Sequence, residues 1–347
     1  MRKELGMFIA LLGLCAVIGV SNPAFYGESN VLNTSRQIAM LGIYAIGISF
    51  VIITGGIDLS VGSVVGLTGV IIARISAPAL EGGVVSGAGY PIWVGITVAM
   101  AVALLIGLAQ GLLITRLGLQ PFIVTLGGML FVRGISQTIA EGGNISFRNH
   151  PFLDFADRGV SVGKFLLPYP VVLCFVVFLI FAYVLHFTVF GRHLYAIGGN
   201  REAAEYSGIP VRRVETTAYV ISAGLAGLAG IAYAAYIGQM SHAVGVAYEL
   251  SAIAAVVLGG CSLRGGEGTI LGVLIGSAVI QILDNGFNMF QVPYTDASGA
   301  VRSWRLNENW KNIVNGGVIL VAVILDQVTH MFRARKRTLR SREEKKT

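Results

Sequence analysis

Long apolar stretches separated by short polar ones run through most of the chain. They cover residues 5–20, 37–54, 60–76, 92–115, 122–140, 166–187, 215–238, 248–258, 269–289 and 310–327, each bounded by glycine, proline or charge. A helix needs about 20 mostly apolar residues to cross a bilayer. The pattern therefore predicts an all-α polytopic membrane protein with about eight to ten transmembrane helices, in which short segments such as 248–258 are broken or re-entrant.

Composition supports this prediction. Hydrophobic residues make up 54% of the chain and charged residues 12%, which is too apolar for an ordinary soluble domain. The 46 glycines allow close helix packing, and we expect the pairs Gly62/Gly66, Gly107/Gly111 and Gly272/Gly276 to serve it. The cysteines, Cys15, Cys174 and Cys261, have neither the spacing of a disulfide framework nor that of a metal site.

The basic residues are distributed unevenly between the two sides of the predicted spans. One side holds Arg2, Lys3, Arg116, Arg192, Arg201, Arg212, Arg213, Arg264 and a basic tail at 331–347, and the other side holds fewer. The positive-inside rule therefore places both termini in the cytoplasm. A basic run directly after a span favours anionic membrane lipid as its partner and not nucleic acid.

An internal repeat links two glycine-rich segments. GGIDLSVG at 55–62 and GGCSLRGG at 259–266 share the pattern GGxxLxxG, and each follows a β-branched apolar run. Paired glycine interruptions in two halves of a membrane chain indicate broken helices that line a transport path, although chance is a rival in so glycine-rich a sequence. The candidate path residues are Gly55, Gly56, Asp58, Ser60, Gly62, Gly259, Gly260, Ser262, Gly265 and Gly266.

Asp58 is the acid embedded between long apolar segments in the first half. A carboxylate near membrane depth is costly, so we expect it to face a cavity, a partner or a helix N-terminus. Asp58 or Ser60 could cap the helix that follows, or Asp58 could contact the solute. Other polar residues within the spans could line the route or form hydrogen bonds between helices: Gln110, Thr125, Gln137, Gln281, Asp284 and Asn285.

The polar stretch 190–215 is the longest insert on the predicted cytoplasmic side. Its core NREAAEYSG predicts a short helix with Asn200 as N-cap, acids in the first turn, and Gly208 and Pro210 at its end. A helix outside the membrane must pack on something. It is either an interfacial helix held by its arginines or a contact for a partner protein.

Enzyme motifs are missing from the sequence. No GxxxxGK[ST] occurs, so the chain cannot bind ATP in a P-loop by itself. GVSVG at 159–163 fits the GxSxG pattern around Ser161, but a nucleophile elbow needs a strand, a turn and a helix, and we expect a loop there.

Four ordered motifs carry a family resemblance. GGIDLSVG, QPFIVTLG, the EAA box and GGCSLRGGEGT together resemble the ribose and simple-sugar branch of the ABC-transporter permeases, over about residues 32–324. The resemblance implies that the polar insert is the coupling helix, which docks on the ATP-hydrolysing subunit. The residues implied for this contact are Asn200, Glu202, Ala203, Ala204 and Gly208.

The same resemblance implies the function and the partners. The chain would be the permease of an ATP-driven importer for a small solute, such as a pentose or similar sugar, in a prokaryotic cytoplasmic (inner) membrane. It would bind no cofactor, and ATP and Mg would sit on two copies of an ABC ATPase subunit. A periplasmic or extracellular solute-binding protein and a second permease copy or paralogue complete the assembly. The alternative is an ion-coupled secondary transporter, with Asp58, Glu249 and Asp284 as its candidate acids.

We expect one transmembrane permease domain over residues 1–347. It divides into an N-terminal half at about 1–187, a cytoplasmic coupling loop at 190–213, a C-terminal half at about 215–327 and the basic cytoplasmic tail.

Overall fold

The computed structural model describes residues 2–79, 86–163, 165–295 and 301–305, with five single helical positions at 313, 316, 317, 320 and 324. Among these residues, seven helices are long and apolar enough to cross a membrane. They are α1 (Arg2–Ser21), α2 (Glu28–Ile53), α4 (Ile92–Leu117), α5 (Pro121–Ile139), α7 (Tyr169–Phe187), α10 (Val211–Ile237) and α12 (Ile270–Met289). The predicted all-α polytopic membrane protein is confirmed.

Two shorter apolar helices, α3 (Val61–Ser76) and α11 (Tyr248–Leu258), match the expected short segments. α11 has 11 residues and, at about 1.5 Å per residue, is too short to cross a bilayer core of about 30 Å. The last expected segment, 310–327, is described only at the five single positions, and the tail at 331–347 lies outside the described residues.

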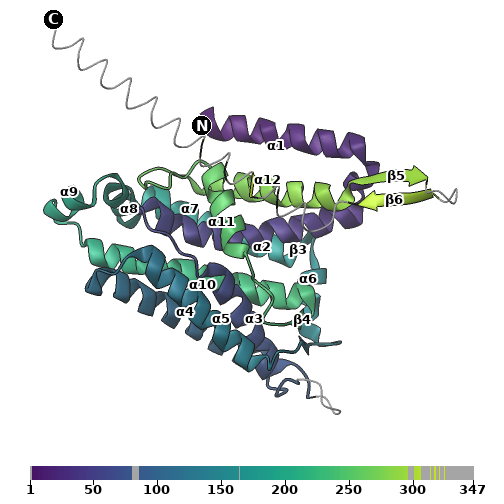
Figure 1. Ribbon diagram of the computed structural model, residues 1–347, viewed down its shortest axis with the longest axis horizontal. Coiled ribbons are helices and arrows are strands. Elements are labelled where there is room, and N and C mark those ends of the chain that lie inside the picture. The colour runs from purple at the N-terminus through teal and green to yellow at the C-terminus, as the bar shows by residue number, and fades with distance from the viewer. Residues whose placement is uncertain are drawn as a thin grey trace, which may run out of the picture.

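α2 forms the centre of the bundle (Figure 1). In the most apolar 18-residue stretch of α2, 83% of the residues are buried, whereas in that of α1 only 6% are buried. α10 packs on α2, α3 and α4, while α7, α11 and α12 cover the other sides of α2. α1 lies at the edge of the bundle, against α12 (Figure 1). The core is therefore built by helices from both halves of the chain.

Members of the glycine pairs allow close helix contacts, as expected. A Cβ atom on Gly107 of α4 would lie 2.6 Å from the Tyr219 carbonyl oxygen of α10. A Cβ atom on Gly276 of α12 would lie 2.0 Å from the Ala255 oxygen of α11. Larger residues would push both helix pairs apart.

The two ends of the bundle differ (Figure 1). One end carries two short helices, α8 (Val189–Gly199) and α9 (Arg201–Tyr206). The other end carries short strand pairs and helical turns: η1 (Pro23–Tyr26), β1 (Ile145–Ser146) with β4 (Gln239–Met240), η2 (Pro151–Leu153), α6 (Asp154–Asp157), β2 (Gly159–Val162) with β3 (Phe165–Pro168), and β5 (Gln291–Thr295) with β6 (Val301–Arg305).

The GVSVG sequence lies in the β2–β3 hairpin and not in the loop that the sequence predicted. Ser161 pairs with Leu166 of β3. The arrangement is strand, turn and strand, so the geometry of a nucleophile elbow is not formed.

Candidate functional site

The first glycine motif ends α2 in a tight turn. Gly55 has φ +85°. The Gly56 N–H donates to the Val51 oxygen at 3.0 Å, and the Gly55 N–H donates to the Ile52 oxygen at 2.9 Å. Bonds of this pattern close a helix C-terminus around one left-handed residue, which favours glycine.

The second glycine motif ends α11 in the same way. Gly260 has φ +85°, and the Cys261 N–H donates to the Val256 oxygen at 3.1 Å. Gly55 is therefore the structural counterpart of Gly260, whereas the sequence pattern aligned it with Gly259. The repeat is shifted by one residue in the structure, because the left-handed position and not the first glycine defines the turn.

Beyond this turn the two motifs diverge. Gly62 lies inside α3, whereas Gly266 lies in the loop before α12. The Thr269 hydroxyl caps α12 by accepting from the Gly272 N–H at 3.1 Å, but Ser60 makes no side-chain cap bond to α3. The structural likeness between the two motifs is thus confined to the helix ends.

The two motifs meet each other, and a third segment joins them. The Gly266 N–H donates to the Ile53 oxygen at 2.9 Å, and a Cβ atom on Gly265 would lie 2.9 Å from the Gly55 nitrogen. Gly198, near the end of α8, rests on this contact, since its Cβ atom would lie 1.9 Å from the Ile53 oxygen. We call these five residues the glycine junction.

The expected path residues are therefore distributed over separate contacts. Gly55, Gly265 and Gly266 come together in the junction. Gly62 packs elsewhere, since a Cβ atom on it would lie 2.3 Å from the Gly245 oxygen. Gly259 packs on α12, where a Cβ atom on it would lie 2.6 Å from the Gly272 oxygen. The buried Ser262 accepts from the Gly265 N–H at 2.9 Å through its carbonyl.

Sequence reasoning missed α8. Its signals are present: the Thr188 hydroxyl accepts from the Gly191 N–H at 3.3 Å as an N-cap, and Leu194 and Ile197 form a buried face. The Tyr195 hydroxyl also donates to the Gly268 oxygen at 2.7 Å. α8 is thus fixed to the loop of the second motif by both backbone and side chain.

α9 forms where the sequence predicted it. The Asn200 side chain accepts from the Ala203 N–H at 2.9 Å, and Gly208 follows the helix with φ +85°. Ala204 is buried, whereas Glu202 and Ala203 are exposed. α9 thus rests on the bundle along one face and presents the opposite face outward.

Arg201 ties α9 to α10, which begins at Val211, inside the expected loop 190–213. The Arg201 guanidinium donates to both carboxylate oxygens of Glu215, at 2.9 Å and 3.2 Å. These hydrogen bonds raise the pKa of Arg201 above its ordinary value. The paired geometry of a guanidinium and a carboxylate fixes orientation as well as distance.

Asp58 is completely buried and bonded on both oxygens. Oδ1 accepts from the Ser60 N–H and hydroxyl at 2.9 Å and 2.7 Å, and Oδ2 accepts from the Ser222 hydroxyl of α10 at 2.7 Å. Asp58 therefore closes a local turn ahead of α3 and binds across to α10, and does not cap α3 as one interpretation expected. Ser60 also lies 3.0 Å from the Gln110 side-chain oxygen of α4.

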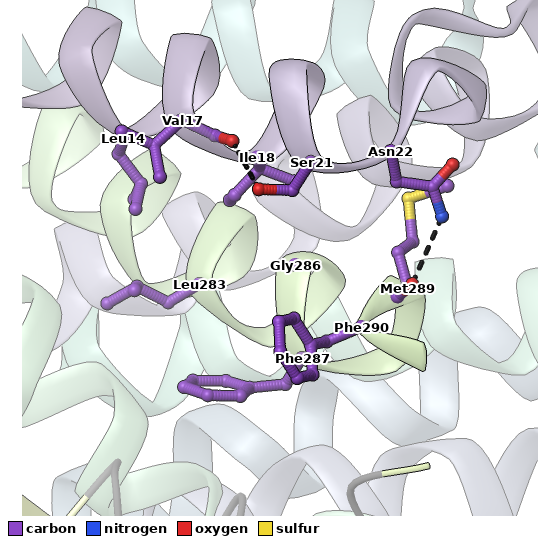
Figure 2. Close-up of a pocket in the computed structure, with 10 residues that line it drawn as sticks. All are labelled: Leu14, Val17, Ile18, Ser21, Asn22, Leu283, Gly286, Phe287, Met289 and Phe290. Carbon is purple, nitrogen blue, oxygen red and sulfur yellow. Dashed lines mark hydrogen bonds between the residues drawn. The ribbon is translucent and has the colours of Figure 1, made fainter. Parts of the chain in front are cut away.

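A separate groove of about 490 Å³ lies between α1 and α12. Figure 2 shows that Leu14, Val17 and Leu283 line it. The Ser21 hydroxyl donates to a backbone oxygen within α1, and the Asn22 amide donates to the Met289 oxygen at 3.1 Å (Figure 2). The polar side chains at this groove are already paired, so we do not place a polar solute there.

Packed spans, two interrupted helices and a short helix held outside the bundle define a polytopic membrane transport subunit. The chain belongs to the family described as the branched-chain amino acid transport system permease component, whose sequence model matches residues 30–323. This membership makes the chain the transport subunit of an ATP-driven importer and not an enzyme, with ATP hydrolysis on a separate subunit. It also favours the ATP-driven mechanism over the ion-coupled alternative.

The chain is similar over nearly its whole length to sugar import permeases. It is 38% identical to the ribose import permease protein RbsC of Bacillus subtilis, over 94% of this chain and 93% of the relative. It is 36% identical to the RbsC protein of Haemophilus influenzae, over 92% and 91%. It is 34% identical to the galactose/methyl galactoside import permease protein MglC of Salmonella typhimurium, over 94% and 95%. No solved structure matches the chain.

Proposed function

We propose that this chain forms the membrane path of an ATP-driven importer for a monosaccharide, a pentose or a similar sugar. Support comes from the family membership and from the names of its relatives, which import ribose or galactosides. A second permease copy or paralogue, two ATPase subunits carrying ATP and Mg, and an external solute-binding protein would complete the assembly. Both termini would lie in the cytoplasm.

α9 is the observation that carries this proposal. It stands at one end of the bundle (Figure 1), and its Tyr206 side chain is 91% exposed. A large exposed aromatic residue beside Glu202 and Ala203 offers a contact for another protein. In the proposed complex this face enters a groove on the ATPase subunit.

Two routes connect α9 to the first glycine motif. The side-chain route runs through the Arg201–Glu215 pair into α10, where Ser222 holds Asp58 at 2.7 Å. The backbone route runs from α9 into α8, where Gly198 rests on the Ile53 oxygen. Rigid helices with specific end contacts can carry a displacement of α9 to the interrupted spans, which is what alternating access requires.

Reconstituted transport tests the function. Proteoliposomes holding the permease, its ATPase and the loaded binding protein should accumulate labelled ribose or galactose with ATP but not with ADP. Leucine, tested with the same complex, is the control for the branched-chain substrate in the family description. Uptake that follows an ion gradient without ATP, or uptake of leucine and not of a sugar, would contradict the proposal.

Two substitutions test the proposed contact of α9. Val at Gly208 forces a β-branched residue into φ +85° and should tilt α9, while Lys at Glu202 reverses the charge of its exposed face. Both variants should bind less ATPase subunit in co-purification, with unchanged insertion into the membrane. ATPase binding and uptake at the parental level in both variants would reduce α9 to an interfacial helix.

Thiol labelling tests the orientation. A cysteine replacing Arg201 should be protected from an impermeant reagent in intact cells, whereas one replacing Ser86, at the opposite end of the bundle, should react. Labelling at 201 but not at 86 would invert the proposed topology.

A further inference from the structure

Three arginines surround a hollow between α4 and α10. The hollow measures about 820 Å³, and its lining includes Arg116, Arg212 and Arg213. The two helices run antiparallel, so the last turn of α4 lies beside the first turn of α10. The Thr115 and Thr216 hydroxyls meet across the interface at 2.8 Å. The geometry is therefore set by helix packing and not by a loop.

These three arginines carry unbalanced positive charge. All three are exposed, and none forms an ion pair with an acid in the part of the chain that the structure describes. The nearest acid along the chain, Glu215, is bonded to Arg201 instead. A ligand of this hollow should therefore be an anion, and guanidinium groups pair best with phosphate or carboxylate oxygens.

The surface next to the hollow is apolar. Leu112 of α4 lines the hollow, and Leu108 and Leu105, one and two helical turns before it on the same face, are 41% and 62% exposed. α4 is also apolar enough to span the membrane. An anion at the hollow would thus stand directly above a surface that suits acyl chains. A phosphate attached to acyl chains fits both surfaces at once, whereas a free phosphate would use the arginines alone.

The geometry points to a binding site for the headgroup of an anionic phospholipid at Arg116, Arg212 and Arg213, with the acyl chains along the exposed leucines of α4. In the proposed orientation this lipid belongs to the cytoplasmic leaflet. The site is independent of which sugar the protein carries. It is also separate from the basic tail, for which the sequence already predicted lipid contact.

Lipid titration tests the site. The detergent-purified chain is titrated with phosphatidylglycerol, phosphatidylcholine and inorganic phosphate, and bound molecules are counted by native mass spectrometry. Replacement of each arginine by Gln should weaken phosphatidylglycerol binding about fivefold, and replacement of all three about a hundredfold, because each basic residue at a membrane surface contributes about 1 kcal/mol. Arg192→Gln removes one exposed charge from α8, outside the hollow, and should leave binding unchanged.

The outcomes separate this site from its alternatives. Substitution of all three arginines by Lys keeps the charge and should retain most of the binding, which guards against a folding defect. Binding of inorganic phosphate with the same affinity as phosphatidylglycerol would overturn the lipid assignment. Unchanged phosphatidylglycerol binding in the triple Gln variant would also overturn it. If the triple Gln variant keeps phosphatidylglycerol binding but no longer co-purifies with the ATPase subunit, the three arginines belong to the protein interface instead.

Discussion

Gly198→Ala probes whether the glycine junction holds α8 against the two motifs. The added Cβ atom would lie 1.9 Å from the Ile53 oxygen and 2.3 Å from the Gly266 nitrogen, well inside a contact distance of about 3.5 Å. Both neighbours are backbone atoms, and they are bonded to each other at 2.9 Å. Neither can rotate away, so α8 must move outward or the hydrogen bond must break.

The cost can be set against a matched control. Overpacking costs about 1–3 kcal/mol and loss of the hydrogen bond about 0.5–1.5 kcal/mol. We therefore expect Gly198→Ala to destabilise the protein by about 1–3 kcal/mol if α8 moves with the bond intact, and by up to about 4.5 kcal/mol if the bond also breaks. Gly199, the next residue in α8, has nothing within 4 Å of its would-be Cβ atom. Because alanine favours the helix over glycine by up to about 1 kcal/mol, Gly199→Ala should be neutral or stabilising.

Two measurements test the packing of Gly198 and the backbone route. Thermal unfolding in detergent compares the stabilities of the two variants, and sugar transported per ATP hydrolysed measures coupling in the reconstituted complex. Loss of folded protein lowers transport and hydrolysis together, whereas a displaced α8 should lower their ratio. Equal stabilities for the two variants would refute the packing argument, and an unchanged ratio in Gly198→Ala would refute the backbone route.

Further substitutions test the side-chain route. Arg201→Glu and Glu215→Arg should each reduce the sugar transported per ATP hydrolysed, and the double variant should restore it. An interaction free energy well below about 1 kcal/mol between the two residues, from a double-mutant cycle of unfolding stability, would show that the ion pair contributes little. Ser222→Ala should cost about 1–3 kcal/mol because it leaves an Asp58 oxygen unpaired, whereas Ser49→Ala, which removes only a bond to Ile46 within α2, should cost less in the same unfolding assay. Asp58→Leu should abolish uptake with normal membrane insertion, and normal uptake would remove Asp58 from the site.

Much of the fold follows from the local hydrophobic pattern. Nine of the ten predicted apolar segments coincide with helices in the described residues, because a run of apolar side chains in lipid must satisfy its backbone internally. The Asn200 cap and the Gly208 turn could also be predicted, because each depends on a few neighbouring residues. Local chemistry is visible in a single sequence.

The partners of the site could not be predicted in this way. Ser222 stands 164 positions from Asp58, and nothing near it marks it among the other serines of the spans. Gly198 resembles Gly199 in sequence, and only the approach of Ile53 and Gly266 distinguishes the two. Such contacts depend on how distant helices pack, which hydrophobic periodicity does not specify.

The central position of α2 has a consequence for synthesis of the protein. α2 emerges from the ribosome early, yet α10, α11 and α12, which cover much of it, are made much later. At about 5–20 residues per second, α2 waits on the order of ten seconds for α10. During this time its apolar surface is held by lipid or by an insertion factor, and the later helices must displace that cover. An amino-terminal fragment ending after α7 should therefore insert into the membrane but remain a target for quality-control proteolysis until the rest of the chain is supplied.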